Sequence, residues 1–506
     1  MSDVASMLRR SVPFLIPGVF LGSVRPQWFP FLPLLLVVGT VATAVVWPRR
    51  RVVSYALMVS VFAVGVARSA WIESGWDRER LSVSVSGTAT VVRNPENDDA
   101  GRKAVVRFDR CDDGTACPKE LSLVTFSVRS DAAFGDVGRL SCLLEPPDPE
   151  WRMYFAKDGI GYRCRAVSWE RTGNRYPVRR ALFMFSSRFE EALSRALPQP
   201  ESGLAAGLLL GGGRRLPEAV TTQFRDAGLS HIVAVSGYNI SIVAEGFLLL
   251  GVGLALSRSR AAVFSLLSTA AFVLVSGAPS SAVRAFGMAS TLVAAGWFGR
   301  RYASVRAILF VASVMLFLNP LLLRHDIGFL LSFAATAGIA LCSPIVGRWT
   351  ASVRTGGFLV ETALLTIVAN LFVLPVIFAN FGTFSPVSFL ANVALLPLVP
   401  YAMFFSALTA FAGMVVPSFG TILSFPAYAL LRPIVLGAGL AASAARPTMI
   451  HLSFGLVAAA VWYVGLAIFL FRGRIMTFLV RPAPVNANAV SSEVWDTGDD
   501  QRKPAS

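Results

Sequence analysis

The sequence predicts a polytopic α-helical membrane protein with an inserted extracytoplasmic small β-barrel domain of the OB-like kind. Of the 506 residues, 54% are hydrophobic and 15% are charged, with a mean hydropathy of +0.60. A soluble protein of this length cannot bury so much apolar surface. Apolar stretches that approach the roughly 20 residues needed to cross a bilayer recur along the chain. Only residues 73–172 depart from this pattern, with short β-prone runs.

Residues 1–72 are expected to form about three transmembrane helices, because apolar segments lie near 11–24, 28–47 and 52–70. The basic run WPRRR (47–51) separates the second from the third and predicts a cytoplasmic loop by the positive-inside rule. The N-terminus is then cytoplasmic, and the chain leaves the third helix outside. Arg9 and Arg10 mimic the start of a signal peptide, but no cleavage site followed by a soluble domain appears, which favours a first membrane helix.

Residues 73–172 are expected to form the β domain. Five short runs with alternating polarity are separated by glycine, proline and acidic turns: 81–92, 104–110, 121–129, 138–145 and 160–168. Five such strands in one small segment predict a closed barrel, with an OB-like fold as the leading candidate.

Four of the five cysteines lie in this β domain, and Cys342 lies in an apolar segment. An even set in a small extracytoplasmic domain favours disulfides. Of the three pairings, we favour Cys111–Cys117 with Cys142–Cys164. A zinc site is the alternative, although the spacing is irregular and no histidine is nearby.

Residues 173–228 are expected to lie at the membrane surface. Within 178–197, one helical stripe carries apolar side chains and the other side carries arginines and glutamates, which is typical of an interfacial helix. The stripe consists of Leu182, Phe185, Phe189, Leu193 and Leu197. The next apolar run, 203–213, is too short to span a bilayer and is expected to be re-entrant or packed against protein.

Residues 229–481 are expected to form a membrane domain of about nine helices, followed by a disordered cytoplasmic tail, 482–506. The apolar segments lie near 232–256, 261–277, 280–298, 304–323, 326–347, 357–380, 385–414, 419–441 and 450–471. Arginines cluster on alternate loops, as the positive-inside rule requires. Residues 173–481 carry 22 basic and 8 acidic side chains, whereas residues 73–172 carry 15 and 17. The excess fits the positive-inside rule, or else a pathway for a polyanion.

Several polar side chains fall inside the apolar segments, where an ionisable group costs roughly 2.5–3.5 kcal/mol. They are Glu245, Arg284, Glu361 and Arg432, together with Asn239, Asn370 and Asn392. Pairing between helices, for instance Glu245 with Arg284, is one interpretation, and the lining of a pathway is the other. Proline and glycine breaks at 276–287, 380–386 and 390–400 favour an interior cavity.

No catalytic set stands out. Ser236 lies in AVSG, which is not the G-x-S-x-G elbow, and His231 precedes it by five residues. The run GGGRRLP lacks the Gly-Lys-Ser/Thr ending of a Walker A loop, and no metal-binding motif is present. We therefore expect neither enzymatic activity nor a cofactor or metal.

Four blocks in order resemble the ComEC family of competence proteins. They are FRDAGLSHIVAVSGYNISIVA (224–244), SGAPSSAVRAFGM (276–288), NPLLLRHDIGFLLSFAATAGI (319–339) and LPVIFANFGTFSPVSFLANVALLPLVP (374–400). The β domain, with FGDVGRL (134–140), is similar to that family's extracytoplasmic OB-like domain. The resemblance extends over about residues 80–480.

The resemblance implies an inner-membrane channel that passes one DNA strand into the cytoplasm during natural transformation. It assigns a set of side chains to the channel path: His231, Ser236, Gly237, Asn239, Glu245, Arg284 and Asn392. Asn239 stands where many relatives have histidine. In the β domain, Phe108, Phe126 and Tyr162 are candidate stacking contacts for DNA, with core packing as the favoured interpretation.

The implied partners are single-stranded DNA, membrane lipid, an extracytoplasmic DNA receptor, a cytoplasmic ATPase and a nuclease. The last two are expected to be separate proteins, because the sequence contains no Walker motif and no H-x-H-x-D-H motif. Many relatives carry a C-terminal metallo-β-lactamase-like domain, and this sequence is expected to be a short form without it. Two alternatives stay open: a transporter of another anionic or lipid-linked substrate, and a membrane hydrolase that uses Ser236.

Overall fold

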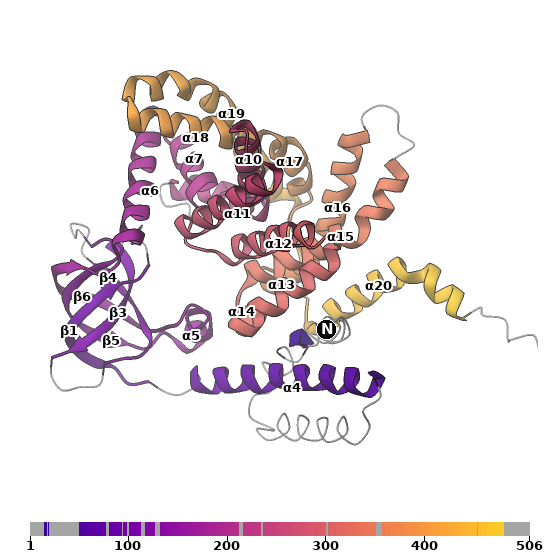
Figure 1. Cartoon of the computed structure of the whole chain (residues 1–506), viewed down its shortest axis with the longest axis horizontal. Helices are drawn as coiled ribbons and strands as arrows, with labels where there is room; N and C mark the ends of the chain where they lie inside the picture. Colours follow the sequence, from indigo (N-terminus) through magenta and orange to yellow (C-terminus); the bar gives the residue numbers. More distant parts are fainter. Residues whose placement is uncertain are drawn as a thin grey trace, which may run out of the picture. The chain divides into compact units, whose positions relative to one another are not determined.

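The computed structural model describes residues 50–76, 80–93, 95–98, 101–112, 117–126, 132–211, 216–233, 236–299, 302–350, 357–452 and 454–479, together with 15–17 and 19. Most of the two apolar segments predicted at 11–24 and 28–47, and the tail predicted at 482–506, lie outside these residues. The chain divides into two compact units, Met1–Ser453 and Phe454–Ser506. Figure 1 traces the elements in chain order.

Helix α4 (Arg50–Trp76) forms at the third predicted apolar segment and leads into the β domain. Its Arg68 reaches the end of helix α13 (Ser304–Leu318), where the guanidinium donates to the carbonyl oxygens of Phe317 at 2.6 Å and Leu318 at 3.3 Å. The last carbonyl groups of a helix have no partner within it, so a cation there satisfies them and complements the helix dipole.

The β domain is a closed five-stranded barrel, as the alternating runs predict. Its strands are β1 (Val83–Val91), β3 (Gly101–Cys111), β4 (Leu121–Phe126), β5 (Asp136–Glu145) and β6 (Ile160–Asn174), with a short β2 (Glu96–Asp98) paired to β3. The order β1-β5-β6-β4-β3 closes through the pairing of β1 with β3. The β4–β6 pair is parallel and the other pairs are antiparallel. Helix α5 (Pro149–Ala156) connects β5 to β6.

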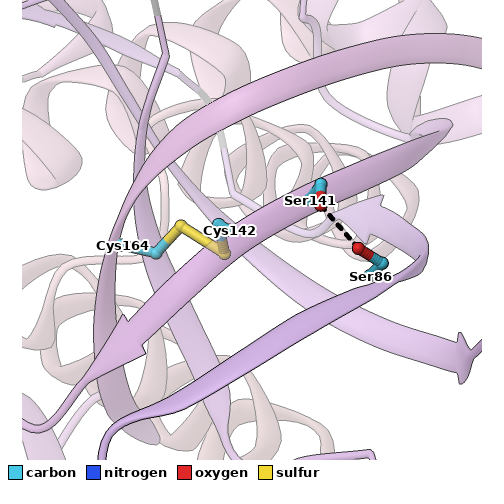
Figure 2. Close-up of a disulfide and its surroundings, with 4 residues drawn as sticks. All are labelled: Ser86, Ser141, Cys142 and Cys164. Carbon is cyan, nitrogen blue, oxygen red and sulfur yellow. Dashed lines mark hydrogen bonds between the residues drawn. A yellow bond between two sulfur atoms is a disulfide. The ribbon is translucent and has the colours of Figure 1, made fainter. Parts of the chain in front are cut away.

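Two disulfides join the strands of the barrel. Cys111 bonds to Cys117, and Cys142 on β5 bonds to Cys164 on β6, which are the two pairs that the sequence favours. The Cα atoms lie 5.6 and 6.1 Å apart, within the usual range for disulfides. Figure 2 shows the second bridge beside the Ser86 and Ser141 hydroxyl groups, whose oxygen atoms lie 2.5 Å apart between β1 and β5.

A buried aspartate ties the barrel to the helix that follows it, α6 (Pro177–Ala196). Asp136 on β5 is 0% exposed, and its Oδ1 atom accepts from Arg171 of β6 at 3.1 Å and from Arg180 of α6 at 2.9 Å. Its Oδ2 atom accepts from the Ala133 N–H at 2.9 Å. A buried carboxylate is stable only when opposite charges and hydrogen bonds compensate its desolvation, and Asp136 has both.

The C-terminal half of the α6 stripe packs on protein helices, whereas Phe185 is 38% exposed, and the interfacial placement of this helix stays a prediction. Phe189 and Leu193 belong to the core that α6 shares with α18 (Val399–Val415) and α19 (Pro417–Ala445), and the Phe189 ring meets Phe411 edge to face, with centroids 5.4 Å apart. An amphipathic pattern alone does not distinguish a lipid surface from a helix surface.

Helix α7 (Glu201–Leu210) is buried over nine of its ten residues, so the short apolar run packs against protein, which was one of its two predicted environments.

Helices lie at all nine predicted segments of 229–481. They are α10 (Gly237–Gly253), α11 (Arg258–Val275), α12 (Ser280–Trp297), α13, α15 (Ile327–Thr350), α16 (Gly357–Asn380), α17 (Val387–Leu395) continued through η2 (Leu396–Leu398) into α18, α19 and α20 (Leu456–Leu479). Among the described residues, six helical stretches are long and apolar enough to cross a membrane. Helix α20 belongs to the second unit.

Candidate functional site

The candidate site lies where the chain breaks between helix α9 (Ser230–Val233) and helix α10. Ser236 caps α10: its Oγ atom accepts from the Asn239 N–H at 3.3 Å and donates to Asn239 Oδ1 at 3.1 Å. The Asn239 side chain in turn donates to the Leu208 carbonyl of α7 at 3.2 Å. The serine and asparagine therefore hold the start of α10 against α7, and they supply the polar partners that a helix start inside apolar surroundings needs.

Arg284 approaches this helix start from α12. A Cβ atom built on Gly237 would collide with its guanidinium group, so glycine at the first position of α10 lets the cation come close to the backbone. Helix α12 begins after Gly277 (φ 84°), Ala278 (φ 53°) and Pro279, a turn that redirects the chain just before the arginine. The GAP break in the sequence therefore positions Arg284 beside the α9–α10 break.

The surroundings of Arg284 contain hydrogen-bond and aromatic partners. Its side chain is buried, at 8% exposure for the residue, and Nη1 donates to Thr336 Oγ1 of α15 at 2.6 Å. Nη1 also lies 3.8 Å from the Met288 sulfur, and the Phe333 ring centroid is 5.8 Å from Cζ. Nε is buried without a hydrogen-bond partner.

Within the part of the chain that the structure describes, no carboxylate oxygen lies within 4.0 Å of Arg284. A buried cation that lacks an opposite charge is costly to the folded state and is suited to an anionic ligand. Thr336 was not among the candidates from the sequence. A threonine within a 24-residue apolar helix is the signal that could have pointed to it.

The ion pair between Glu245 and Arg284, one of the two interpretations from the sequence, is not formed. Glu245 lies two turns further along α10 and is exposed, whereas Arg284 faces the start of that helix. His231 of α9 is also exposed.

Asn392 lies on α17 and is buried, with its Oδ1 atom unpartnered. Four residues earlier on that helix, Ser388 packs on Gly228, where a Cβ atom would lie 2.6 Å from the serine Cβ. Helix α17 therefore lies against the turn before α9, but the described contacts do not join Asn392 to Arg284.

Ser236 is placed as a helix cap and not as a nucleophile. Both of its hydrogen bonds go to Asn239, whose amide oxygen and backbone N–H cannot act as a general base. In the described residues, no group of three or more histidine, cysteine or acidic side chains is arranged to hold a metal ion.

The buried carboxylate of Glu201, in the helical domain, has a partner that the sequence did not suggest. Arg432 of α19 donates from Nη1 to Glu201 Oε1 of α7 at 2.9 Å. Glu201 is 1% exposed, and its other oxygen has no hydrogen-bond partner. Glu201 lies at the start of an apolar run. The sequence therefore gave no indication that its side chain is buried.

The three aromatic candidates of the barrel belong largely to its core. Phe126 is 1% exposed and meets Trp169 edge to face, with ring centroids 5.3 Å apart, and Phe108 is 5% exposed. Both rings are packed in the core, which is the interpretation that the sequence favours for them. Tyr162 is half-buried against the same core, and burial, followed by the nearby Glu120 carboxylate, raises the pKa of its hydroxyl group.

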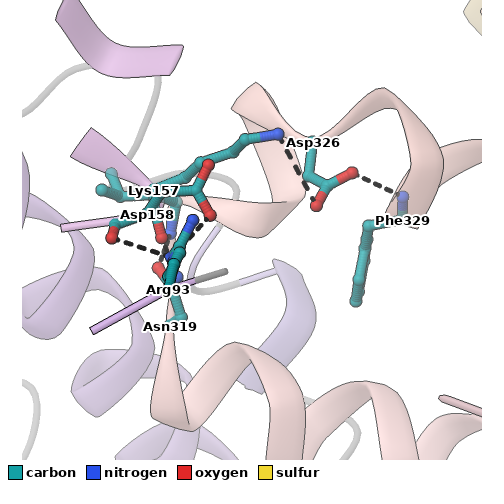
Figure 3. Close-up of polar contacts among 7 residues, drawn as sticks. Arg93, Lys157, Asp158, Asn319, Asp326 and Phe329 are labelled. Carbon is teal, nitrogen blue, oxygen red and sulfur yellow. Dashed lines mark hydrogen bonds and ion pairs between the residues drawn. The ribbon is translucent and has the colours of Figure 1, made fainter. Parts of the chain in front are cut away.

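The barrel contacts the helical domain through the turn after α5 (Figure 3). Asn319, just past the end of α13, donates from Nδ2 to the Lys157 carbonyl at 2.7 Å. The Lys157 ammonium lies 3.9 Å from Asp326 Oδ2, and Asp326 Oδ1 caps α15 by accepting from the Phe329 N–H at 3.0 Å. Beside this junction, burial and the positive charges of Arg324 and Lys157 lower the pKa of His325 to about 4.

A comparison with protein families matches the part of the chain that contains the candidate site. A model of a family described as "Competence protein" matches residues 208–475, slightly more than half of the chain. "ComE operon protein 3" of Bacillus subtilis (strain 168) is 28% identical over 207 residues, which are 41% of this chain and 26% of that protein. The chain therefore covers about a quarter of the length of this curated relative. No solved structure gives a significant match.

Proposed function

The chain belongs to the competence protein family, and from this premise we propose that it is an inner-membrane channel passing single-stranded DNA into the cytoplasm during natural transformation. Membership of the family supports a role in DNA uptake. The match contains the α9–α10 break and Arg284, whereas the barrel precedes it.

The observation that carries the proposal is the buried guanidinium of Arg284 at the α9–α10 break. Arginine binds phosphate oxygens through its planar fork, and a low-dielectric site strengthens that attraction. With Thr336 as a neutral hydrogen-bond partner, the charge is held in position without being neutralised. A phosphate group of a passing strand would supply the missing negative charge.

The junction between the barrel and the helices supports an extracytoplasmic barrel. If α15 crosses the membrane, the α13–α15 connection that holds Lys157 lies on the side opposite the end of α15, which carries Arg348. By the positive-inside rule the end of α15 faces the cytoplasm. The two disulfides of the barrel agree, because disulfides persist outside the reducing cytoplasm. We also propose that both chain termini are cytoplasmic, as the positive-inside rule predicts from the sequence.

A channel of this kind needs partners. We propose that the chain is not an enzyme, and that a cytoplasmic ATPase draws the strand in while a separate nuclease removes its complement. An extracytoplasmic receptor would deliver the DNA. A transporter of another anionic or lipid-linked substrate is the alternative, because an unneutralised arginine suits any anion. The cap role of Ser236 disfavours the hydrolase.

The experiment is uptake of labelled DNA by cells of a naturally competent host that lack this gene. The cells are complemented with the wild-type chain, Arg284→Gln or Arg284→Glu. Arg446→Gln is the matched control, because it removes the same charge from an exposed side chain, paired with Asp226 at 3.5 Å. We expect the wild type and Arg446→Gln to restore uptake, and both Arg284 variants to fail at equal abundance in the membrane.

Undiminished uptake in the deletion strain would exclude the channel. Restoration of DNA uptake by both Arg284 variants would show that Arg284 does not line the path of the strand. Loss of uptake with Arg446→Gln as well would show that total charge, and not the buried site, is responsible.

A further inference from the structure

Helix α5 presents two large aromatic side chains away from the barrel core. Trp151 is 54% exposed and Tyr154 is 45% exposed, and their rings lie 5.8 Å apart, edge to face. They are three positions apart in the sequence, so they share one face of the helix. Neither residue belongs to the barrel's hydrophobic cluster. Exposed tryptophan on a short helix is an unusual feature of a water-facing domain and marks an interaction surface.

The position of α5 is fixed by contacts with the ends of the membrane helices. The Lys157 carbonyl at the end of α5 accepts from Asn319, the residue after the last residue of α13. The Lys157 ammonium approaches Asp326, the residue before the first residue of α15. Helix α15 is one of the six candidate spans, and α13 is a shorter apolar helix. The apolar helices therefore stop where α5 is attached.

Helix α4 passes the end of α13, which gives an independent measure of this level. Arg68 of α4 bonds to the carbonyl groups of Phe317 and Leu318, the last two residues of α13. Trp71 follows one turn later on α4 and is 74% exposed. Two tryptophans and a tyrosine, from two helices, thus lie around the end of α13.

From these contacts we propose that α5 is an interfacial anchor: Trp151 and Tyr154, with Trp71 of α4, lie in the headgroup region of the bilayer and seat the barrel on the membrane surface. Tryptophan and tyrosine concentrate at this depth because their rings are apolar and their N–H or O–H groups reach water. The Lys157 ammonium, paired with Asp326, lies 4.2 Å from the Tyr154 ring centroid, which links the aromatic face of α5 to the start of α15. The occupant is lipid, and the proposal holds whatever substrate the membrane domain carries.

The test is photocrosslinking of the full chain in liposomes of phosphatidylcholine and phosphatidylglycerol that contain a clickable phospholipid. A photoreactive benzoylphenylalanine replaces Trp151 or Tyr154, one at a time. The control position is Glu170 of β6, which is exposed and pairs with Arg139, far along β5 from the start of α5. Each variant is first checked for wild-type elution and for both disulfides, so that unfolded protein does not enter the comparison.

We expect several-fold more lipid adduct at positions 151 and 154 than at position 170. Equal labelling at all three positions would overturn the proposal, since it would reflect random collision. Adducts to a second copy of the chain, with no lipid adduct, would also overturn it and assign the aromatic face to self-association. As a second measurement, Trp151→Phe should reduce the quenching of tryptophan fluorescence by lipids brominated near the headgroup, whereas lipids brominated at the chain ends should show no such change.

Discussion

Two buried charges, Asp136 in the barrel and Arg284 in the helical domain, differ in how far their surroundings compensate them. In the barrel, Asp136 is fully buried and receives two arginines and a backbone N–H. In the helical domain, Arg284 is buried with a threonine hydroxyl as its close polar partner and with one nitrogen unpartnered. Because compensation is complete in the first case, that charge stabilises the fold. In the second case the described residues supply no opposite charge, and the guanidinium is suited to an anionic ligand.

This difference separates stability from function along one chain. A charge that is fully paired inside the protein has no capacity left for a ligand, whereas an unneutralised one costs stability and is retained for another reason. Substitution of Asp136 should therefore lower stability, whereas substitution of Arg284 should lower DNA uptake without lowering stability. The following predictions test that contrast from the largest expected effect to the smallest.

The largest effect on stability is expected for Asp136→Ala. It leaves Arg171 and Arg180 without their carboxylate and should lower the free energy of unfolding of the barrel by about 3–5 kcal/mol. Arg284→Gln should cost no stability, because it removes a desolvated charge that has no opposite charge. Urea unfolding of the solubilised chain, followed by fluorescence, measures both. An equal loss for Arg284→Gln would show that an anionic partner already neutralises it.

Removal of the disulfides should give the next largest loss, and it should be confined to the barrel. The bridge Cys142–Cys164 closes a separation of 22 residues and Cys111–Cys117 one of 6. The chain-entropy model gives about 3 kcal/mol for the first and about 2 kcal/mol for the second. Paired alanine substitutions, measured by the same urea unfolding, should reproduce this order. A larger loss from the short loop would contradict the entropic account.

The pH dependence of stability should be visible at the junction between the two domains. The pKa of His325 is lowered from 6.5 to about 4 in the folded chain, mainly by burial. Above pH 6.5 the imidazole is neutral in both states. Between pH 6.5 and 4 the unfolded chain binds a proton that the folded chain does not, so stability falls as pH falls. The loss is at most about 3 kcal/mol, and smaller to the extent that water reaches the ring.

The measurement for His325 compares thermal unfolding of the wild type with that of His325→Gln at pH 7, 5.5 and 4.5. The variant should lose less stability than the wild type across this window, and carboxylates that titrate in both proteins cancel in the difference. Parallel pH profiles for the two proteins would mean that the histidine is hydrated in the folded state.

The sequence predicted most elements because they depend on local pattern. The alternation in residues 81–168 became the barrel, and each apolar segment after residue 229 became a helix. The GAP break was correctly predicted as an interruption, whereas the α9–α10 break lies at the start of the segment predicted at 232–256. What failed depends on packing between distant elements. Phe189 of α6 packs on Phe411 of α18, a partner that the sequence did not suggest, and Glu245 and Arg284 face different directions on neighbouring helices. Periodicity gives the face of an element but not its partner.

The smallest predicted effect concerns one of the contacts that join the two regions. Asn319→Ala removes the donor to the Lys157 carbonyl and should cost about 1 kcal/mol, the usual net contribution of one hydrogen bond. The global stability of either region should hardly change, because the bond lies between them.

Amide hydrogen exchange in residues 157–161 should therefore accelerate several-fold, while exchange in the rest of β6 and in α15 stays as in the wild type. Since Asn319 also accepts from the Leu321 N–H through Oδ1 at 3.2 Å, Asn319→Asp keeps that acceptor, and it replaces the donor by a negatively charged carboxylate oxygen. Faster exchange in both variants assigns the effect to the lost donor and shows that the barrel and the helices are separate stable units joined by a weak contact. Faster exchange in the alanine variant alone assigns it to the turn at the end of α13. Acceleration throughout the barrel would instead mean that its stability depends on the membrane helices, and the contrast between the two regions would then not hold.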